Sequence, residues 1–136
     1  MNCKTALAIT AALGITACAF AAEVDLSKLP AASTKTGLTY ATDIKPLFDT
    51  SCVKCHGEQK PKAKLRLDSL EAALKGSENG KVIQPGNSVK SVLVLNIAHL
   101  GDSDDFMPPV KNKLGIKQLT DEQIGLVRAW IDQGAK

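Results

Sequence analysis

The sequence predicts a small all-α domain, because its apolar residues recur at helical spacing and polar residues stand where helix caps are expected. The chain has 136 residues, a formal net charge of +3, 44% apolar residues and only 4% aromatic residues. This length and composition are typical of one globular domain. Because the positive and negative charges nearly balance, nothing indicates nucleic-acid binding.

The first 21 residues are expected to be an export signal. Lys4 is their only charge, and the apolar run over residues 6–17 is shorter than the ~20 residues that span a bilayer. Residues 19–21 (AFA) form the small-residue pattern that precedes cleavage, so we expect a periplasmic or otherwise exported protein. Alternatively, residues 15–18 (ITAC) resemble a lipobox, which would make Cys18 the lipidated N-terminus of a membrane-anchored lipoprotein.

Residues 22–38 are expected to be an N-terminal tether that precedes a domain over residues 39–136. They show no sustained period and contain Pro30 and Gly37. The first helix is predicted to begin at a cap on Thr42 or Asp43. Pro46 would then fall in its first turn, where proline is tolerated. The apolar positions that share one side of this helix are Ile44, Leu47, Phe48 and Cys55.

Three further elements follow along the chain. A short helix over residues 70–75 is expected between a cap at Asp68 or Ser69 and a stop at Gly76. Residues 89–100 are β-branched enough for a strand, but their apolar spacing favours a helix, and residues 101–115 are expected to be a long loop. The last helix is predicted from a capping box of Thr120 and Gln123, an apolar stripe and a stop at Gly134.

The cysteines indicate a cofactor. Without the export signal the chain keeps only Cys52 and Cys55, unless Cys18 is the lipid anchor, so a disulfide framework is excluded. These two cysteines belong to the run CVKCH that ends at His56, which is the C-x-x-C-H attachment sequence of c-type haem. On a helix the two thiols lie one turn apart and can add to two vinyl groups of one porphyrin, while His56 binds the iron. We therefore expect one covalently attached haem c.

Three other interpretations of C-x-x-C-H stay open. A thioredoxin-like redox pair is expected within a βαβ pattern, which the sequence lacks. Structural zinc needs four ligands, and beyond the motif only His99 remains as a strong candidate. A disulfide between Cys52 and Cys55 would close a very small loop and would stabilise the fold little.

A second iron ligand is predicted at Met107. It is the only methionine beyond the export signal, and the two prolines that follow it restrict the backbone and favour a fixed presentation of the thioether. Met107 could instead fill a gap in the core, as methionine often does. His99 is the alternative distal ligand and would give iron bound by two histidines.

Several short motifs follow one another along the chain: Phe48, CVKCHG (52–57), LRLDS (65–69), Pro85-Gly86, Ser91, MPP (107–109), Leu119 and WIDQGA (130–135). Taken in this order, they resemble the planctomycete-type cytochrome c domain, over about residues 39–136. The resemblance implies a small helical cytochrome c fold wrapped around one haem, with His56 and Met107 as axial ligands and with Phe48 and Trp130 in one cluster.

Filled axial positions would leave no site for oxygen or peroxide, so we expect an electron carrier and not an enzyme. A haem with a displaceable distal ligand that reduces peroxide or binds a gas is one alternative, and a haem-stabilised interaction module without a redox role is another.

Redox partner proteins are expected, and we expect a monomer that meets a membrane only through Cys18. Acidic partners would fit the basic cluster after the haem motif, although the same residues could form a merely solvated loop. This cluster comprises Lys54, Lys60, Lys62, Lys64 and Arg66.

Overall fold

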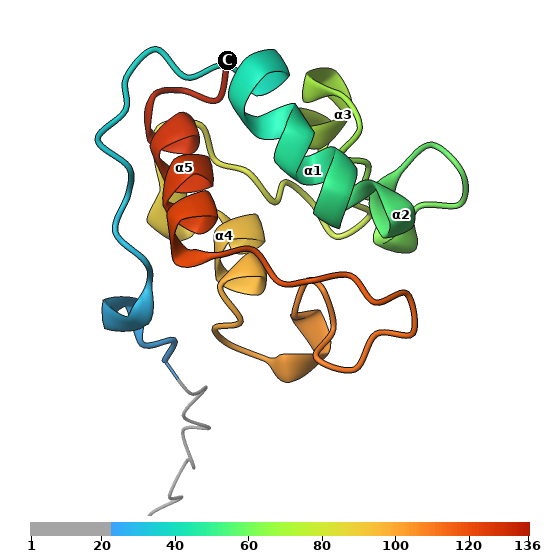
Figure 1. Cartoon of the computed structure of the whole chain (residues 1–136). Coiled ribbons are helices and arrows are strands. Elements are labelled where there is room, and N and C mark those ends of the chain that lie inside the picture. Colours follow the sequence, from blue (N-terminus) through green and yellow to red (C-terminus); the bar gives the residue numbers. More distant parts are fainter. Residues whose placement is uncertain (1–22) are drawn as a thin grey trace, which may run out of the picture.

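The structure is a computed structural model that describes residues 23–136. Within these residues all regular structure is helical and no strand forms, which confirms the predicted all-α class (Figure 1). Single helical turns and irregular loops connect the α-helices. The α-helices of this part of the chain are α1 (Lys45–Ser51), α2 (Val53–His56), α3 (Leu70–Lys75), α4 (Val92–Ile97) and α5 (Asp121–Asp132).

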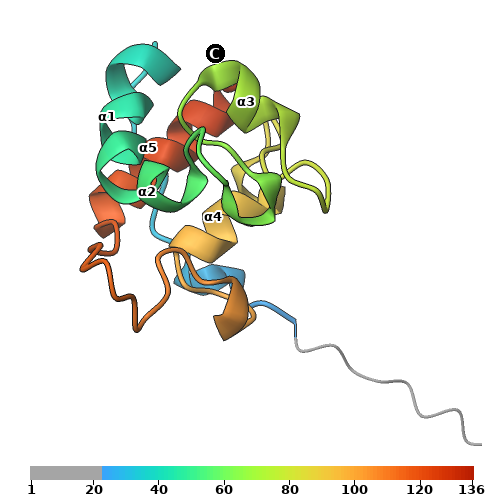
Figure 2. The ribbon, with the colours of Figure 1, turned by 90° about the vertical axis from the view of Figure 1, so that its right-hand side faces the viewer.

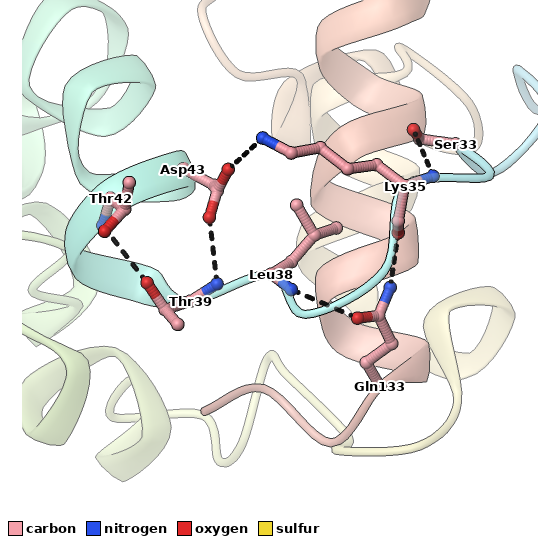
Figure 3. A network of polar contacts seen from close by, with 7 residues as sticks. All are labelled: Ser33, Lys35, Leu38, Thr39, Thr42, Asp43 and Gln133. Atoms are coloured by element: carbon pink, nitrogen blue, oxygen red, sulfur yellow. Dashed lines mark hydrogen bonds and ion pairs between the residues drawn. The ribbon is translucent and has the colours of Figure 1, made fainter.

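The first helix begins earlier than predicted. A π-helical turn (Tyr40–Ile44) precedes α1, and Thr39 is its N-cap because the Thr39 hydroxyl accepts a hydrogen bond from the Thr42 N–H at 3.3 Å. The predicted cap at Thr42 or Asp43 is therefore wrong. The carboxylate of Asp43 accepts the N–H of Thr39 at 3.0 Å and pairs with Lys35 at 2.6 Å (Figure 3).

The prediction for α3 is confirmed, whereas α4 is shorter than expected. Ser69 caps α3 by accepting the Ala72 N–H at 3.2 Å, and Gly76 ends it with φ +92°. Within the predicted helix over residues 89–100, a 3-10 turn (Ser88–Lys90) is separated from α4 by an extended Ser91. Ser88 is held by Asp132, which accepts its N–H at 2.7 Å and its hydroxyl at 2.9 Å, and this long-range contact sets the break.

Helix α5 forms the centre of the core. Its capping box is present, with Gln123 N–H donating to the Thr120 hydroxyl at 3.3 Å and Thr120 N–H donating to the Gln123 side chain at 2.9 Å. Trp130 of α5 is fully buried and packs edge-on against Phe48 of α1, with ring centroids 6.5 Å apart. Tyr40 completes the cluster at 6.0 Å from the ring of Trp130. The expected contact of Phe48 with Trp130 is confirmed.

Residues 23–38, which we call the N-terminal strap, form a 3-10 turn (Leu26–Lys28) and then run without regular structure beside α5 (Figures 1 and 3). The N–H of Ser33 donates to the Gly125 carbonyl at 2.9 Å, and Arg128 donates to the Pro30 carbonyl. Near the end of the strap, the Gln133 amide accepts the N–H of Leu38 at 3.2 Å. The segment expected to be a tether is thus part of the packed fold.

The chain packs closely where the strap crosses α5. A Cβ atom added at Gly125 would collide with the carbonyl oxygen of Ala31. No helix within residues 23–136 is long and apolar enough to cross a membrane. The expected export signal and Cys18 lie outside the described residues.

Candidate haem site

The C-x-x-C-H motif lies at the junction of α1 and α2. The N–H of Cys52 donates to the Phe48 carbonyl at 2.8 Å, and the Cys52 carbonyl accepts the N–H groups of Cys55 at 3.0 Å and His56 at 2.9 Å. The helical path therefore continues through the motif, with a kink at Cys52. Cys52 is buried, Cys55 is half-buried, and both thiols are free. Within residues 23–136, no group of three or more His, Cys, Asp or Glu side chains is placed to hold a metal ion.

Burial favours the neutral forms of Cys52 and His56. It raises the pKa of the Cys52 thiol to about 12. It also lowers the pKa of His56, because the charged imidazolium is poorly solvated there. The Nδ1 atom of His56 lies 3.2 Å from the Leu65 carbonyl oxygen. In the tautomer that donates this bond, Nε2 keeps its lone pair free for a metal, which is the arrangement expected of a histidine ligand.

The segment after the motif fixes it from the other side. The N–H of Leu67 donates to the His56 carbonyl at 2.7 Å, and Leu65 and Leu67 are both buried. The Leu67 carbonyl in turn accepts the buried hydroxyl of Tyr40 at 2.8 Å. Backbone bonds thus connect the motif to the aromatic cluster under α1.

An apolar cavity separates the motif from the loop between α4 and α5. This loop lies below α2 in Figures 1 and 2. The structure therefore brings the predicted residues Cys52, Cys55, His56 and Met107 together around one space. Met107 is half-buried and packs against the core. The cavity is lined by Ser51, Cys52, Cys55, His56, Ile97, Met107, Pro108, Ile116 and Leu119.

The chemistry of these side chains fits a haem c. Two thiols and one imidazole stand on one wall, a thioether stands on the other, and aliphatic side chains surround them. The cavity itself is narrow, at about 20 Å³, which is close to the space of one water molecule. The residues thus fit the group by their chemistry, whereas the space between them is smaller than a porphyrin.

His99, the alternative ligand, lies outside this cavity. Its ring stacks on Phe106 with centroids 4.6 Å apart and planes 10° apart. It lines a different cavity, beside residues 23–25 and Lys28 of the strap and residues 100–102. The Nε2 atom of His99 is buried without a hydrogen-bond partner among the described residues.

Several residues of the site were missed by the sequence analysis. Ile116 lines the cavity although it adjoins a polar loop, and so does Leu119, which the sequence analysis named only as a motif residue. Asn112 shapes this loop, because its side chain accepts the Ile116 N–H at 2.7 Å and donates to the Ile116 carbonyl at 3.0 Å. Asn96 of α4 was also missed, and its carbonyl accepts the Met107 N–H at 3.0 Å. The only sequence signal for this side of the cavity was that apolar residues occur again at the end of the loop.

The basic cluster is partly neutralised. Arg66 forms two hydrogen bonds with Asp68, at 2.6 and 3.0 Å, and this contact holds the pKa of Asp68 below its usual range. Lys64 lies 3.4 Å from Glu78. Three lysines of the cluster form no ion pair with any described residue, and all are exposed: Lys54, Lys60 and Lys62.

The residues of this site were compared with known protein families. Residues 52–111 match the family model described as Planctomycete cytochrome C, and the match includes both the C-x-x-C-H motif and Met107. No curated protein and no solved structure matches the chain. The family match and the helical fold agree with the resemblance seen in the sequence. The match supports a planctomycete-type cytochrome c domain that includes residues 52–111, and with it a haem-binding c-type cytochrome.

Proposed function

We propose that this protein is an exported electron carrier with one haem, attached through Cys52 and Cys55 and ligated by His56 and Met107. The observation that supports this most directly is the cavity that has the C-x-x-C-H motif on one wall and Met107 on the other. A haem held there would supply an iron that alternates between two oxidation states. The proposed export depends on the first 21 residues of the sequence.

The wall of the cavity that carries Cys52, Cys55 and His56 is called the proximal wall. Its side chains have separate roles in this proposal. Cys52 and Cys55 would hold a haem through thioether bonds. His56 would bind its iron, and the bond from His56 to the Leu65 carbonyl fixes the orientation of the imidazole. Backbone hydrogen bonds define the position of this wall.

The opposite wall, which the Met107 loop forms, is called the distal wall. It decides between electron transfer and the binding of oxygen, peroxide or a gas at the iron. If Met107 occupies the second axial position, no site is open to oxygen or peroxide, and methionine ligation raises the reduction potential. Apolar neighbours such as Ile97 and Leu119 exclude water from the site. These features favour a carrier over a peroxide-reducing or gas-binding protein.

Acidic redox partners are proposed to dock near Lys54, Lys60 and Lys62. These exposed lysines lie within α2 or shortly after it, close to the motif, and no described acidic group neutralises them. Positive charge there would speed encounter with an acidic partner, and salt would weaken the effect. We propose that the protein acts as a monomer in such encounters.

The test is to produce the full chain in a bacterium that attaches haem c and to record oxidised and reduced spectra. We expect haem that stays bound under denaturing conditions, low-spin iron in both states and no rapid binding of carbon monoxide. The variant with serine at both Cys52 and Cys55 serves as the control and should lose the covalent haem. High-spin ferrous iron that binds carbon monoxide at once would instead support the gas or peroxide alternative.

A further inference from the structure

We infer that His99 is a positioning residue that holds the Met107 loop in place through Phe106. The inference deepens the proposed function and rests on it, because Met107 is the proposed distal ligand. The evidence is the stack of His99 on Phe106, the residue directly before Met107 in the chain. His99 thereby acts on the iron site without contacting the iron.

The geometry of His99 indicates that its ring is used for packing. The imidazole lies almost parallel to the ring of Phe106, with planes 10° apart and centroids at 4.6 Å. Its backbone has φ +53°, a left-handed conformation that glycine adopts more readily. The buried Nε2 atom forms no hydrogen bond with a described residue, so the ring is not held by polar contacts at that atom.

The end of α4 holds this loop at two successive residues. The ring of His99 contacts Phe106, and the carbonyl of Asn96 accepts the Met107 N–H at 3.0 Å. The remaining backbone bonds nearby are local, such as the Asp105 N–H to the Asp102 carbonyl at 3.1 Å, and do not connect the loop to a helix. The stack and the Asn96 bond therefore determine where Met107 stands relative to the cavity.

The start of the strap lies near the same corner. A Cβ atom added at Gly101 would lie 3.5 Å from a methyl carbon of Val24, so the two segments are in close proximity. Residues 23–25 and His99 nevertheless line a shared cavity of about 590 Å³. The stack on Phe106, and not the strap, is therefore the contact that His99 makes with the Met107 loop.

The test is the affinity of the ferric haem protein for added imidazole, which must displace Met107 to bind. Without the stack, Met107 should dissociate from the iron more often. The His99→Ala variant should therefore bind imidazole about 2- to 10-fold more tightly, given the strength of aromatic stacks. Its near-infrared-edge sulfur-to-iron absorption band should also weaken.

Matched variants separate positioning from ligation and from general instability. His99→Phe keeps a ring for the stack but has no nitrogen, and it should resemble the native protein. Leu74→Ala in α3 lowers stability at the end of the molecule away from the Met107 loop and should leave imidazole affinity unchanged (Figures 1 and 2). Phe106→Leu should reproduce the effect of His99→Ala, and the double variant should add little to either.

Two results would overturn the inference. One is native imidazole affinity in His99→Ala. The other is the same gain in affinity for His99→Phe as for His99→Ala, because the nitrogen and not the stack would then matter. Failure of the proposed function has a different signature. In that case the native protein lacks the sulfur-to-iron band, and Met107→Ala does not change its spectrum.

Discussion

The two walls of the cavity differ in how the chain holds them. The proximal wall stands on helices, and backbone bonds connect Cys52 to Phe48 and His56 to Leu67. The distal wall stands on a long loop that reaches α4 through the Met107 N–H and through the stack of Phe106 on His99. Phe48 is fully buried, whereas Phe106 and Met107 are half-buried.

This difference suggests a division of roles. Backbone hydrogen bonds within a buried core open rarely, so the proximal wall is expected to keep its geometry with or without a cofactor. The Met107 loop is held by fewer such contacts, so its geometry is expected to vary more. The proximal wall would thus determine whether haem is held. The distal wall would determine how easily another ligand reaches the iron.

The largest expected effect concerns the support of the proximal wall. Trp130→Ala removes a fully buried ring that packs against Phe48, and we expect it to lower the free energy of unfolding by about 3–5 kcal/mol. Urea unfolding followed by circular dichroism measures this loss. Phe106→Ala on the distal wall should cost far less stability yet change the spectrum more. Equal losses for the two variants would contradict the comparison.

The strap should show an intermediate effect. Gly125→Ala improves helix propensity by about 1 kcal/mol, but its methyl group would collide with the carbonyl of Ala31. We expect the collision to dominate, because overpacking typically costs 1–3 kcal/mol, and the melting temperature should fall. In a chain that begins at Leu38, the same substitution should become stabilising. A gain in stability in the full chain would show that the strap does not pack there.

A smaller effect is expected within the distal wall. Asn112→Ala removes three side-chain hydrogen bonds, one to Pro109 and two to Ile116, from a half-buried turn. We expect a loss of about 1 kcal/mol or less in stability, because this loop contributes little to the core. The rate of carbon monoxide binding to ferrous iron should nevertheless rise. An unchanged rate would argue against Asn112 as a determinant of loop position.

The smallest effect on the fold is expected at the basic cluster. Lys62→Glu replaces an exposed lysine that forms no ion pair with any residue over 23–136, and stability should stay within about 0.5 kcal/mol of the native value. Electron transfer to a small acidic redox protein should slow at low ionic strength and should approach the native rate in high salt. Lys28→Glu, in the strap, is the control and should have little effect on this rate.

Local signals in the sequence predicted part of the fold, and long-range contacts explain the rest. The caps of α3 and α5 were found because Ser69 and Thr120 bind their own helices. The start of the first helix was missed because Asp43 bonds to Thr39 and pairs with Lys35 of the strap. The shortened α4 depends on Ser88 and on Asp132, which lies 44 residues further along the chain.

The same distinction applies to the candidate site. The C-x-x-C-H motif and the single methionine beyond the first residue predicted that Cys52, Cys55, His56 and Met107 would meet, but they did not predict the aliphatic residues that complete the cavity. The ring stack of His99 was not predictable, because a histidine near a helix end looks the same whether it binds iron or packs against a loop. Phe106 becomes its partner only because the loop folds back toward the end of α4, which the sequence does not show.

The most direct test of the central claim is proton NMR of the ferrous haem protein with carbon-13 in its methionine methyl groups. The chain has two methionines, Met1 and Met107, so the spectrum is simple to assign. If Met107 binds the iron, the porphyrin ring current should shift its methyl resonance far upfield, and Met107→Leu should remove that signal. Methyl resonances that all remain at ordinary positions in the native protein would contradict the account.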